Sequence, residues 1–140
     1  IPGRIVNVLG RAKASADPWF NVSKHVAKAV LTAMKYDYRN RAAMNIRYDT
    51  RIIKAARKLG WIISFYDRRE EPEEIRKLEG KTIPWGTETA IKRIGGKVPD
   101  LMYHEGDWGK EPMIIVFGRD AVEVVEKVEK LLNEAFKQSA

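Results

Sequence analysis

His25 is one of only two histidines in the chain, and it lies where its imidazole could contact an anion. Ser23 precedes it near the predicted start of a helix, whose unpaired N–H groups and partial positive charge favour phosphate. By position alone, the plainer interpretation of a surface histidine beside a capping serine is favoured. Because the chain has two histidines and no cysteine, neither a histidine-rich nor a thiolate metal site can form within one chain.

Asn45 and Arg47 alternate with Met44 and Ile46 along a predicted strand over 42–48, so both polar side chains point the same way. The guanidinium of Arg47 could bind a phosphate through two N–H groups, and the amide of Asn45 could fix a heterocycle through one donor and one acceptor. The alternative is that the two residues form the solvent face of an edge strand. The pattern favours neither interpretation over the other.

Asp67, Arg68 and Arg69 follow directly after an apolar stretch over 61–66 that predicts a strand. Ligand groups of α/β sheets often lie just beyond the ends of strands. One carboxylate and two guanidinium groups there could hold magnesium and a phosphate together. A solvated charge run is the ordinary alternative, because several glutamates follow before residue 75.

The segment over 106–112 is a compact loop that contains Gly106 and Gly109. Its backbone N–H groups could form an anion-binding concavity, to which Lys110 would add a positive charge. Most sequences of this kind are turns between strands, so the loop alone is a weak indication of a site.

The elements that would position these residues alternate between strands and helices. β-Branched residues between Gly3 and Gly10 predict a first strand, and the helix that follows begins at Asp17-Pro18 or at Ser23 and runs to about Tyr36. Further strands are predicted over 42–48, 61–66, 100–104 and 113–117. Further helices are predicted from a Thr50 cap to Gly60, from Pro72, from Pro84 to Gly95-Gly96, and from a capping box at Asp120 and Glu123.

This order of elements predicts an α/β fold around a sheet that is covered on both faces. Helices separate the first three strands, which allows them to pair in parallel. The short loop between 100–104 and 113–117 instead favours an antiparallel pair, so we expect a mixed sheet. All of it fits one domain over 1–140.

The chain has 140 residues, of which 44% are apolar, enough for one hydrophobic core. No apolar run approaches the roughly 20 residues that span a bilayer, and the first residues do not resemble a signal peptide. The chain does not begin with methionine, so we expect a piece of a longer protein. A charged fraction of 32% and the absence of cysteine suit a thermophilic, cytoplasmic protein.

A net charge of +7 favours anionic partners without choosing among them. Basic residues near two tyrosines could contact a nucleic-acid backbone; they are Lys24, Lys28, Lys35, Arg39 and Arg41. No DNA- or RNA-binding motif accompanies them, so a solvated helix face is favoured and we do not expect nucleic acid as a partner. The glycine-rich motifs of nucleotide-binding loops are absent as well.

Five motifs in order resemble one known family. They are Pro2-Gly3-Arg4-Ile5-Val6, Ser23-Lys24-His25-Val26-Ala27, Ala43-Met44-Asn45-Ile46-Arg47-Tyr48, Ser64-Phe65-Tyr66-Asp67-Arg68-Arg69-Glu70-Glu71-Pro72 and Gly106-Asp107-Trp108-Gly109-Lys110-Glu111-Pro112. Together they are similar to the ThiN domain, the archaeal-type thiamine-phosphate synthase domain. The resemblance covers nearly the whole chain. Such domains are typically the C-terminal part of a fusion with a hydroxymethylpyrimidine phosphate kinase.

The resemblance implies a fold and a reaction. The fold would be a three-layer α/β/α sandwich on a mixed sheet, similar to class II aldolases of the AraD type. The reaction would couple hydroxymethylpyrimidine diphosphate with hydroxyethylthiazole phosphate to give thiamine monophosphate and diphosphate. Magnesium is the cofactor that the resemblance implies.

In ThiN domains an arginine of the first motif and a histidine of the Ser-x-His motif carry activity, and these match Arg4 and His25. We expect other residues to contact substrates or their phosphates; they are Ser23, Asn45, Arg47, Arg68 and Lys110. Asp67 or Asp107 would bind magnesium. The chain departs from the family at Asn21, where we expect glycine, and an altered helix entry there would loosen the phosphate site.

A ligand sensor is the alternative function. ThiN-like domains fused to DNA-binding modules bind thiamine phosphates and regulate transcription without catalysis, although the presence of both Arg4 and His25 favours an enzyme. As partners we expect phosphorylated small molecules and an upstream kinase domain in the full chain, and no membrane. The sequence leaves homo-oligomer formation open.

Overall fold

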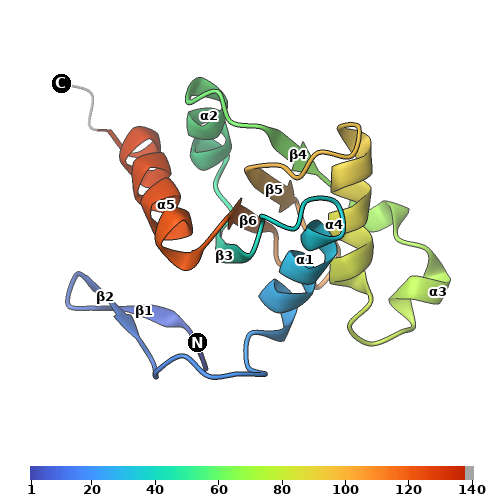
Figure 1. Ribbon diagram of the computed structural model, residues 1–140, viewed down its shortest axis with the longest axis horizontal. Coiled ribbons are helices and arrows are strands. Elements are labelled where there is room, and N and C mark those ends of the chain that lie inside the picture. Colours follow the sequence, from blue (N-terminus) through green and yellow to red (C-terminus); the bar gives the residue numbers. More distant parts are fainter. Residues whose placement is uncertain (138–140) are drawn as a thin grey trace.

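A mixed sheet of four strands lies at the centre of the computed structural model, which describes residues 1–137 (Figure 1). The strands are β3 (Ala42–Arg47), β4 (Ile63–Phe65), β5 (Leu101–His104) and β6 (Met113–Gly118), in the order β3-β6-β5-β4. β4 and β5 are parallel, whereas β6 is antiparallel to both of its neighbours. The predicted mixed sheet and its predicted antiparallel pair are therefore confirmed.

The first predicted strand lies outside this sheet. β1 (Ile5–Val8) pairs antiparallel with β2 (Arg11–Ala14), so the parallel pairing that the order of elements allows for the opening strand does not form. Leu9 and Gly10 have φ of 50° and 80°, the left-handed geometry of a two-residue hairpin turn. The Gly10 N–H also donates to Asn7 Oδ1. The chain therefore reverses after four residues, into a segment whose polar composition does not predict a strand.

Helices cover both faces of the four-stranded sheet. They are α1 (Lys24–Met34), α2 (Thr50–Lys58), α4 (Thr82–Arg93) and α5 (Ala121–Ala135), with a short α3 (Glu73–Arg76) and a 3₁₀ turn, η1 (Arg68–Glu70), between β4 and α4. Along β6, Ile114 and Val116 point into a core with α2 and α5, whereas Ile115 and Phe117 point into a core with α1 and α4. Figure 1 shows these helix pairs on opposite sides of the sheet, which gives three layers.

The helices begin close to where the sequence predicts. α1 begins after Ser23, the second of its two predicted starts, but the Ser23 side chain makes no capping hydrogen bond. α2 begins one residue earlier than expected, because Asp49 rather than Thr50 is its cap and accepts from the Arg51 N–H. Asp120 caps α5 as predicted by accepting from the Glu123 N–H.

The buried face of α1 consists of small residues. Ala29, Thr32 and Ala33 point into the core, while Val26 and Val30, from the apolar pattern that predicts this helix, are only half-buried. Ala90 of α4 is also fully buried, so the two helices pack closely through small side chains. None of the helices in residues 1–137 is long and apolar enough to cross a membrane.

Gly86 of α4 tests this close packing. A Cβ at this position would lie 2.6 Å from the ring of Tyr66, which is itself fully buried. We predict that Gly86→Ala lowers the free energy of unfolding by about 1–3 kcal/mol through overpacking, although the same exchange inside a helix usually adds about 1 kcal/mol. Thermal or urea denaturation measures the change. In a Tyr66→Leu background the loss shrinks; an alanine variant that is more stable than the natural chain would contradict the packing.

Candidate active site

Several predicted site residues lie along one edge of the sheet, the edge at which β3, β4 and β5 end. Arg47, the last residue of β3, lies opposite Met113, the first of β6, which also lies opposite His104, the last of β5. β4 runs parallel to β5 and ends at the same edge. The segments that follow β4 and β5, around Asp67 and Lys110, therefore begin at this edge, as ligand loops of α/β sheets do.

The start of α1 lies toward the same edge. α1 packs against β3 and α4, and its last turn leads through residues 35–41 into the first residue of β3. Helix and strand thus run in opposite senses, so Ser23 and His25 lie toward the end of β3 that carries Arg47. Both Ser23 and His25 are exposed. The helix start is therefore open to an anion from solvent.

Asn45 and Arg47 point toward the α1 side of the sheet. Their partners across the strand pair are Ile115 and Met113, which pack with the α1–α4 core. Both polar side chains are exposed, because β3 is an edge strand. The residues therefore form an exposed strand face, as one interpretation expects, and that face is on the side of α1. Their contact with substrates stays a prediction.

Asn21 gives a physical account of the departure from the family pattern. Its φ is 61°, in the left-handed region that glycine adopts without strain. Asparagine tolerates this conformation better than most other residues with a side chain. Asn21 therefore adopts the backbone conformation that glycine favours at this position. An open pocket lies there, lined by Ile1, Trp19–Lys24, Ala27 and Lys28.

Arg4 lies at the base of the β1–β2 hairpin. Its backbone N–H donates to Ser15 Oγ, and its carbonyl accepts from the Ser15 N–H. Ser23 Oγ accepts a 3.0 Å hydrogen bond from the nitrogen of Ile1, three residues before Arg4. Since three residues span at most about 10 Å, Arg4 and the start of α1 are neighbouring segments. The Arg4 side chain is exposed.

Arg68 and Arg69 differ in their surroundings. Arg68 is only 8% exposed, and its Nη2 lies 3.4 Å from the Glu71 carboxylate, which also accepts from the Thr82 hydroxyl. Its guanidinium is therefore turned inward, away from a phosphate at the surface. Arg69 is the exposed arginine of the pair. The phosphate role of Arg68 remains a prediction.

A buried polar cluster that the sequence analysis missed lies beneath the site. It consists of Tyr66, Arg68, Glu71 and His104. Among the described residues, Tyr66 Oη, Arg68 Nε and Glu71 Oε2 are buried without a hydrogen-bond partner. The rings of Tyr66 and His104 are 5.0 Å apart. Only the position of His104 at a strand end could have indicated this cluster from the sequence.

His104 is held in its neutral form. Burial and the positive charge of Arg68 lower the pKa of the imidazole to about 4. Gly106 donates its N–H to His104 Nδ1 at 3.0 Å, so Nδ1 is the acceptor and the proton lies on Nε2. Burial likewise raises the pKa of the Tyr66 hydroxyl. The cluster therefore contains a neutral histidine and a neutral tyrosine at pH 7.

The predicted magnesium residues both lie near Arg69. Both carboxylate oxygens of Asp67 accept from its guanidinium, which lowers the pKa of Asp67 to about 2. Asp107 and Glu105 also lie close enough to help raise the pKa of Arg69. Residues 1–137 contain no group of three or more histidine, aspartate or glutamate residues that could hold a metal. Two carboxylates fit a magnesium ion that is completed by substrate phosphates, not an all-protein cage.

The loop that carries Lys110 is a tight turn. Asp107 and Lys110 exchange two backbone hydrogen bonds, of 3.2 and 2.8 Å. Gly106 has φ of 83°, and a Cβ there would lie 2.4 Å from the Lys110 carbonyl oxygen. Lys110 and Trp108 are exposed. The loop is thus a turn between strands, and it leaves the Lys110 side chain exposed at the edge of the sheet.

Comparison with known proteins identifies the class to which this site belongs. The sequence profile of the family described as Thiamine-phosphate synthase ThiN matches residues 1–130. The chain therefore belongs to the ThiN family, which confirms the resemblance inferred from its motifs. The match covers all the candidate site residues, from Arg4 to Lys110.

Two curated relatives are similar over most of the chain. A thiamine-phosphate synthase ThiN of Methanothermobacter thermautotrophicus is 44% identical over 134 residues, which are 96% of this chain and 70% of the relative. The bifunctional thiamine biosynthesis protein ThiDN of Methanocaldococcus jannaschii is 46% identical over 130 residues, 92% of this chain and 30% of the relative. This domain thus occurs within longer proteins.

Two solved structures have the same fold. The C-terminal domain of a phosphomethylpyrimidine kinase matches with a TM-score of 0.84 and 54% identity, over 91% of this chain and 71% of that one. A second crystallised C-terminal domain matches with a TM-score of 0.81 and 44% identity, over 93% and 68%.

The depressed pKa of His104 predicts a pH dependence of stability. The folded-state pKa of about 4 lies below the ordinary 6.5, so the unfolded chain takes up this proton first as the pH falls. We expect stability to be fully present above pH 6.5 and to decrease by about 2–3 kcal/mol toward pH 4. Chemical denaturation at several pH values measures this. His104→Asn, which keeps an acceptor near Nδ1, should flatten the curve between pH 4.5 and 6.5; an unchanged slope would contradict the assignment.

Proposed function

We propose that this chain couples hydroxymethylpyrimidine diphosphate with hydroxyethylthiazole phosphate and releases diphosphate. The thiazole nitrogen supplies the electron pair for the new bond to the pyrimidine methylene carbon. The bond from that carbon to the diphosphate oxygen breaks, and its electron pair leaves with the diphosphate. Membership of the ThiN family over residues 1–130 carries this proposal.

The electronic demands of this reaction match the groups at the start of α1. The electron-rich pyrimidine ring stabilises the positive charge that develops on the methylene carbon. The protein therefore mainly has to stabilise negative charge on the departing diphosphate, which requires fixed cations and oriented N–H donors. Arg4, the N–H groups of the first α1 turn, and the exposed Lys24 supply both. In this proposal His25 donates a hydrogen bond or a proton to the diphosphate.

The face of β3 on the α1 side suits the rest of the substrates. Asn45 presents one amide donor and one carbonyl acceptor, the pair that a pyrimidine ring nitrogen and its amino group require. Arg47 lies two residues further along the same exposed face and suits the phosphate of the thiazole substrate. Lys110, on the neighbouring loop, would add charge to that phosphate site.

Magnesium would enter this site with the diphosphate. Asp67 and Asp107 are the residues that would hold it, because Asp67 pairs with Arg69 and Asp107 lies close enough to help raise the pKa of Arg69. When bound, the ion would neutralise charge on the leaving diphosphate. Asp67 would then exchange part of its pairing with Arg69 for the metal.

The natural context of this domain is a further part of the proposal. The ThiDN relative is bifunctional, and the chain spans only 30% of it. One of the matching structures is the C-terminal domain of a phosphomethylpyrimidine kinase. A linked kinase domain would produce the diphosphate substrate next to the site that consumes it. A cytoplasmic location and a likeness to AraD-type aldolases remain predictions.

The roles of Arg4 and His25 are tested by single substitutions. We predict that Arg4→Ala and His25→Ala each lower kcat/KM by at least about 100-fold, because each removes a group that stabilises the departing charge. Mass spectrometry of thiamine monophosphate formed from both substrates and magnesium measures the rate. Lys35→Ala, at the opposite end of α1, is the matched control and should leave the rate within about twofold.

Two outcomes would contradict these assignments. Undiminished turnover in both variants would remove Arg4 and His25 from the site. A natural chain that binds thiamine monophosphate tightly but forms none would indicate the alternative function, a thiamine-phosphate sensor.

The magnesium proposal has its own test. We expect a chelator to abolish turnover and added Mg²⁺ to restore it, since the diphosphate carries several negative charges. Asp107→Asn should raise the Mg²⁺ concentration for half-maximal rate by at least about threefold, because a neutral amide binds the ion more weakly. Glu74→Gln, an exposed carboxylate on α3, is the control. Full activity in the chelator would refute the role of magnesium.

A further inference from the structure

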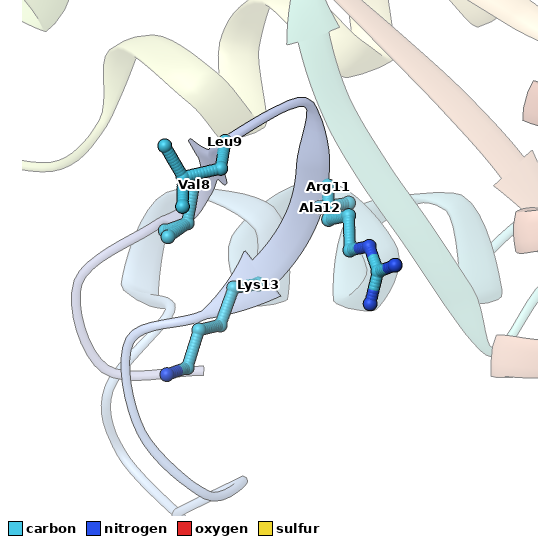
Figure 2. Close-up of a pocket in the computed structure, with 5 residues that line it drawn as sticks. All are labelled: Val8, Leu9, Arg11, Ala12 and Lys13. Atoms are coloured by element: carbon cyan, nitrogen blue, oxygen red, sulfur yellow. The ribbon is translucent and has the colours of Figure 1, made fainter.

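The β1–β2 hairpin is exposed over its whole length. Every residue of both strands is solvent-accessible, and Leu9 at the turn is 99% exposed. Figure 1 shows the hairpin standing out from the α/β layers. Figure 2 shows an open pocket that five hairpin residues line by themselves. An isolated two-stranded hairpin is only marginally stable in water, so this one needs a surface to cover it.

One face of the hairpin combines aliphatic and cationic side chains. Val6 lies opposite Lys13 and Val8 lies opposite Arg11, so these four residues share a face. Asn7 lies on the other face, with Ala12 opposite. Val6 and Val8 are 41% and 42% exposed. No acidic residue precedes Asp17 in the chain, so the hairpin is purely cationic.

The outer stripe of α5 combines aliphatic and anionic side chains. Val122, Val125, Glu126 and Glu129 follow helical spacing and therefore share the solvent side of this helix. Val122 and Val125 are 67% and 45% exposed. Two exposed valines beside two carboxylates match the two exposed valines beside two cations on the hairpin.

The two faces do not cover each other within one chain. Both pairs of valines are exposed in the same molecule. The hairpin is held at its base, since Ser15 bonds the Arg4 backbone and Ser23 bonds the nitrogen of Ile1. The hairpin is thus fixed at its base and complementary to α5, which it does not cover in its own chain. This arrangement suits a reciprocal contact between two molecules, in which each hairpin covers α5 of the other.

We propose that this chain forms a symmetric dimer in which the Val6–Val8 face of each hairpin packs on the Val122–Val125 stripe of α5 in a second copy. The valines would form the apolar centre, and Arg11 and Lys13 would pair with Glu126 and Glu129. The symmetry gives two identical contacts, which doubles the buried area. Each hairpin, and Arg4 at its base, would then be fixed by the partner. The proposal does not rest on the proposed function.

Engineered cysteines test this arrangement, since the natural chain has none. Two single variants, Val8→Cys and Val125→Cys, are mixed and treated with a short bismaleimide. We expect a covalent species of twice the 16.0 kDa chain mass that contains one copy of each variant. Asn7→Cys, on the other face of the hairpin, is the matched control and should cross-link to Val125→Cys at least ten-fold less. Circular dichroism checks that each variant folds.

The outcomes of this experiment separate the possible occupants of the α5 stripe. A cross-link within one chain of the Val8→Cys/Val125→Cys double variant, with none between mixed single variants, would overturn the reciprocal contact. Equal yields from Asn7→Cys and Val8→Cys would overturn the assigned face. A chain that sediments as a monomer and forms no cross-link would also overturn it, and would leave another domain as the occupant.

Charge reversal provides a second, independent readout. Arg11→Glu/Lys13→Glu makes the hairpin anionic, and Glu126→Lys/Glu129→Lys makes the α5 stripe cationic. Each double variant alone should dimerise at least ten-fold more weakly in sedimentation equilibrium, because like charges then meet at both contacts. A mixture of the two should recover natural affinity, since opposite charges meet again. Failure of the mixture to recover would contradict the pairing.

Discussion

The close packing of α1 against α4 and β3 is the constraint on which the candidate site depends. Ala29 and Ala33 are fully buried where a larger side chain would push the helix outward. The Lys28 ammonium group also donates a 3.0 Å hydrogen bond to the Gly80 carbonyl oxygen. This packing directs the unpaired N–H groups of the α1 start toward the sheet edge where β3 ends. Core packing therefore determines where the partial positive charge of the α1 N-terminus lies.

Beneath that edge, the buried cluster of Tyr66, Arg68, Glu71 and His104 supports the loops that present the exposed groups. Arg68 is buried and paired with Glu71, whereas the neighbouring Arg69 is exposed and paired with Asp67. One holds the loop after β4 to the interior, and the other leaves a cation at the surface. The neutral His104 anchors Gly106, at the start of the loop that carries Lys110. The loops after β4 and β5 are thereby attached to the buried core.

The sequence was a good guide wherever local pattern decides structure. Asp120 with Glu123, the left-handed Gly60, and the short loop before β6 each have a local physical cause, and each prediction from them holds. The hairpin was missed because its second strand has no apolar pattern and depends on the turn at Leu9-Gly10. The inward turn of Arg68 was missed because, although Glu71 is only three residues away, Thr82 and His104 join this pair only in the folded chain. The ordered motifs identified the family, although each alone was weak.

In the proposed reaction, Arg4 and the start of α1 together hold the departing diphosphate. A crystal structure of this chain with magnesium diphosphate tests it most directly. We predict diphosphate between the Arg4 guanidinium and the N–H groups of Ser23, Lys24 and His25, within hydrogen-bond distance of both. Diphosphate bound elsewhere, with this space filled only by solvent, would contradict it.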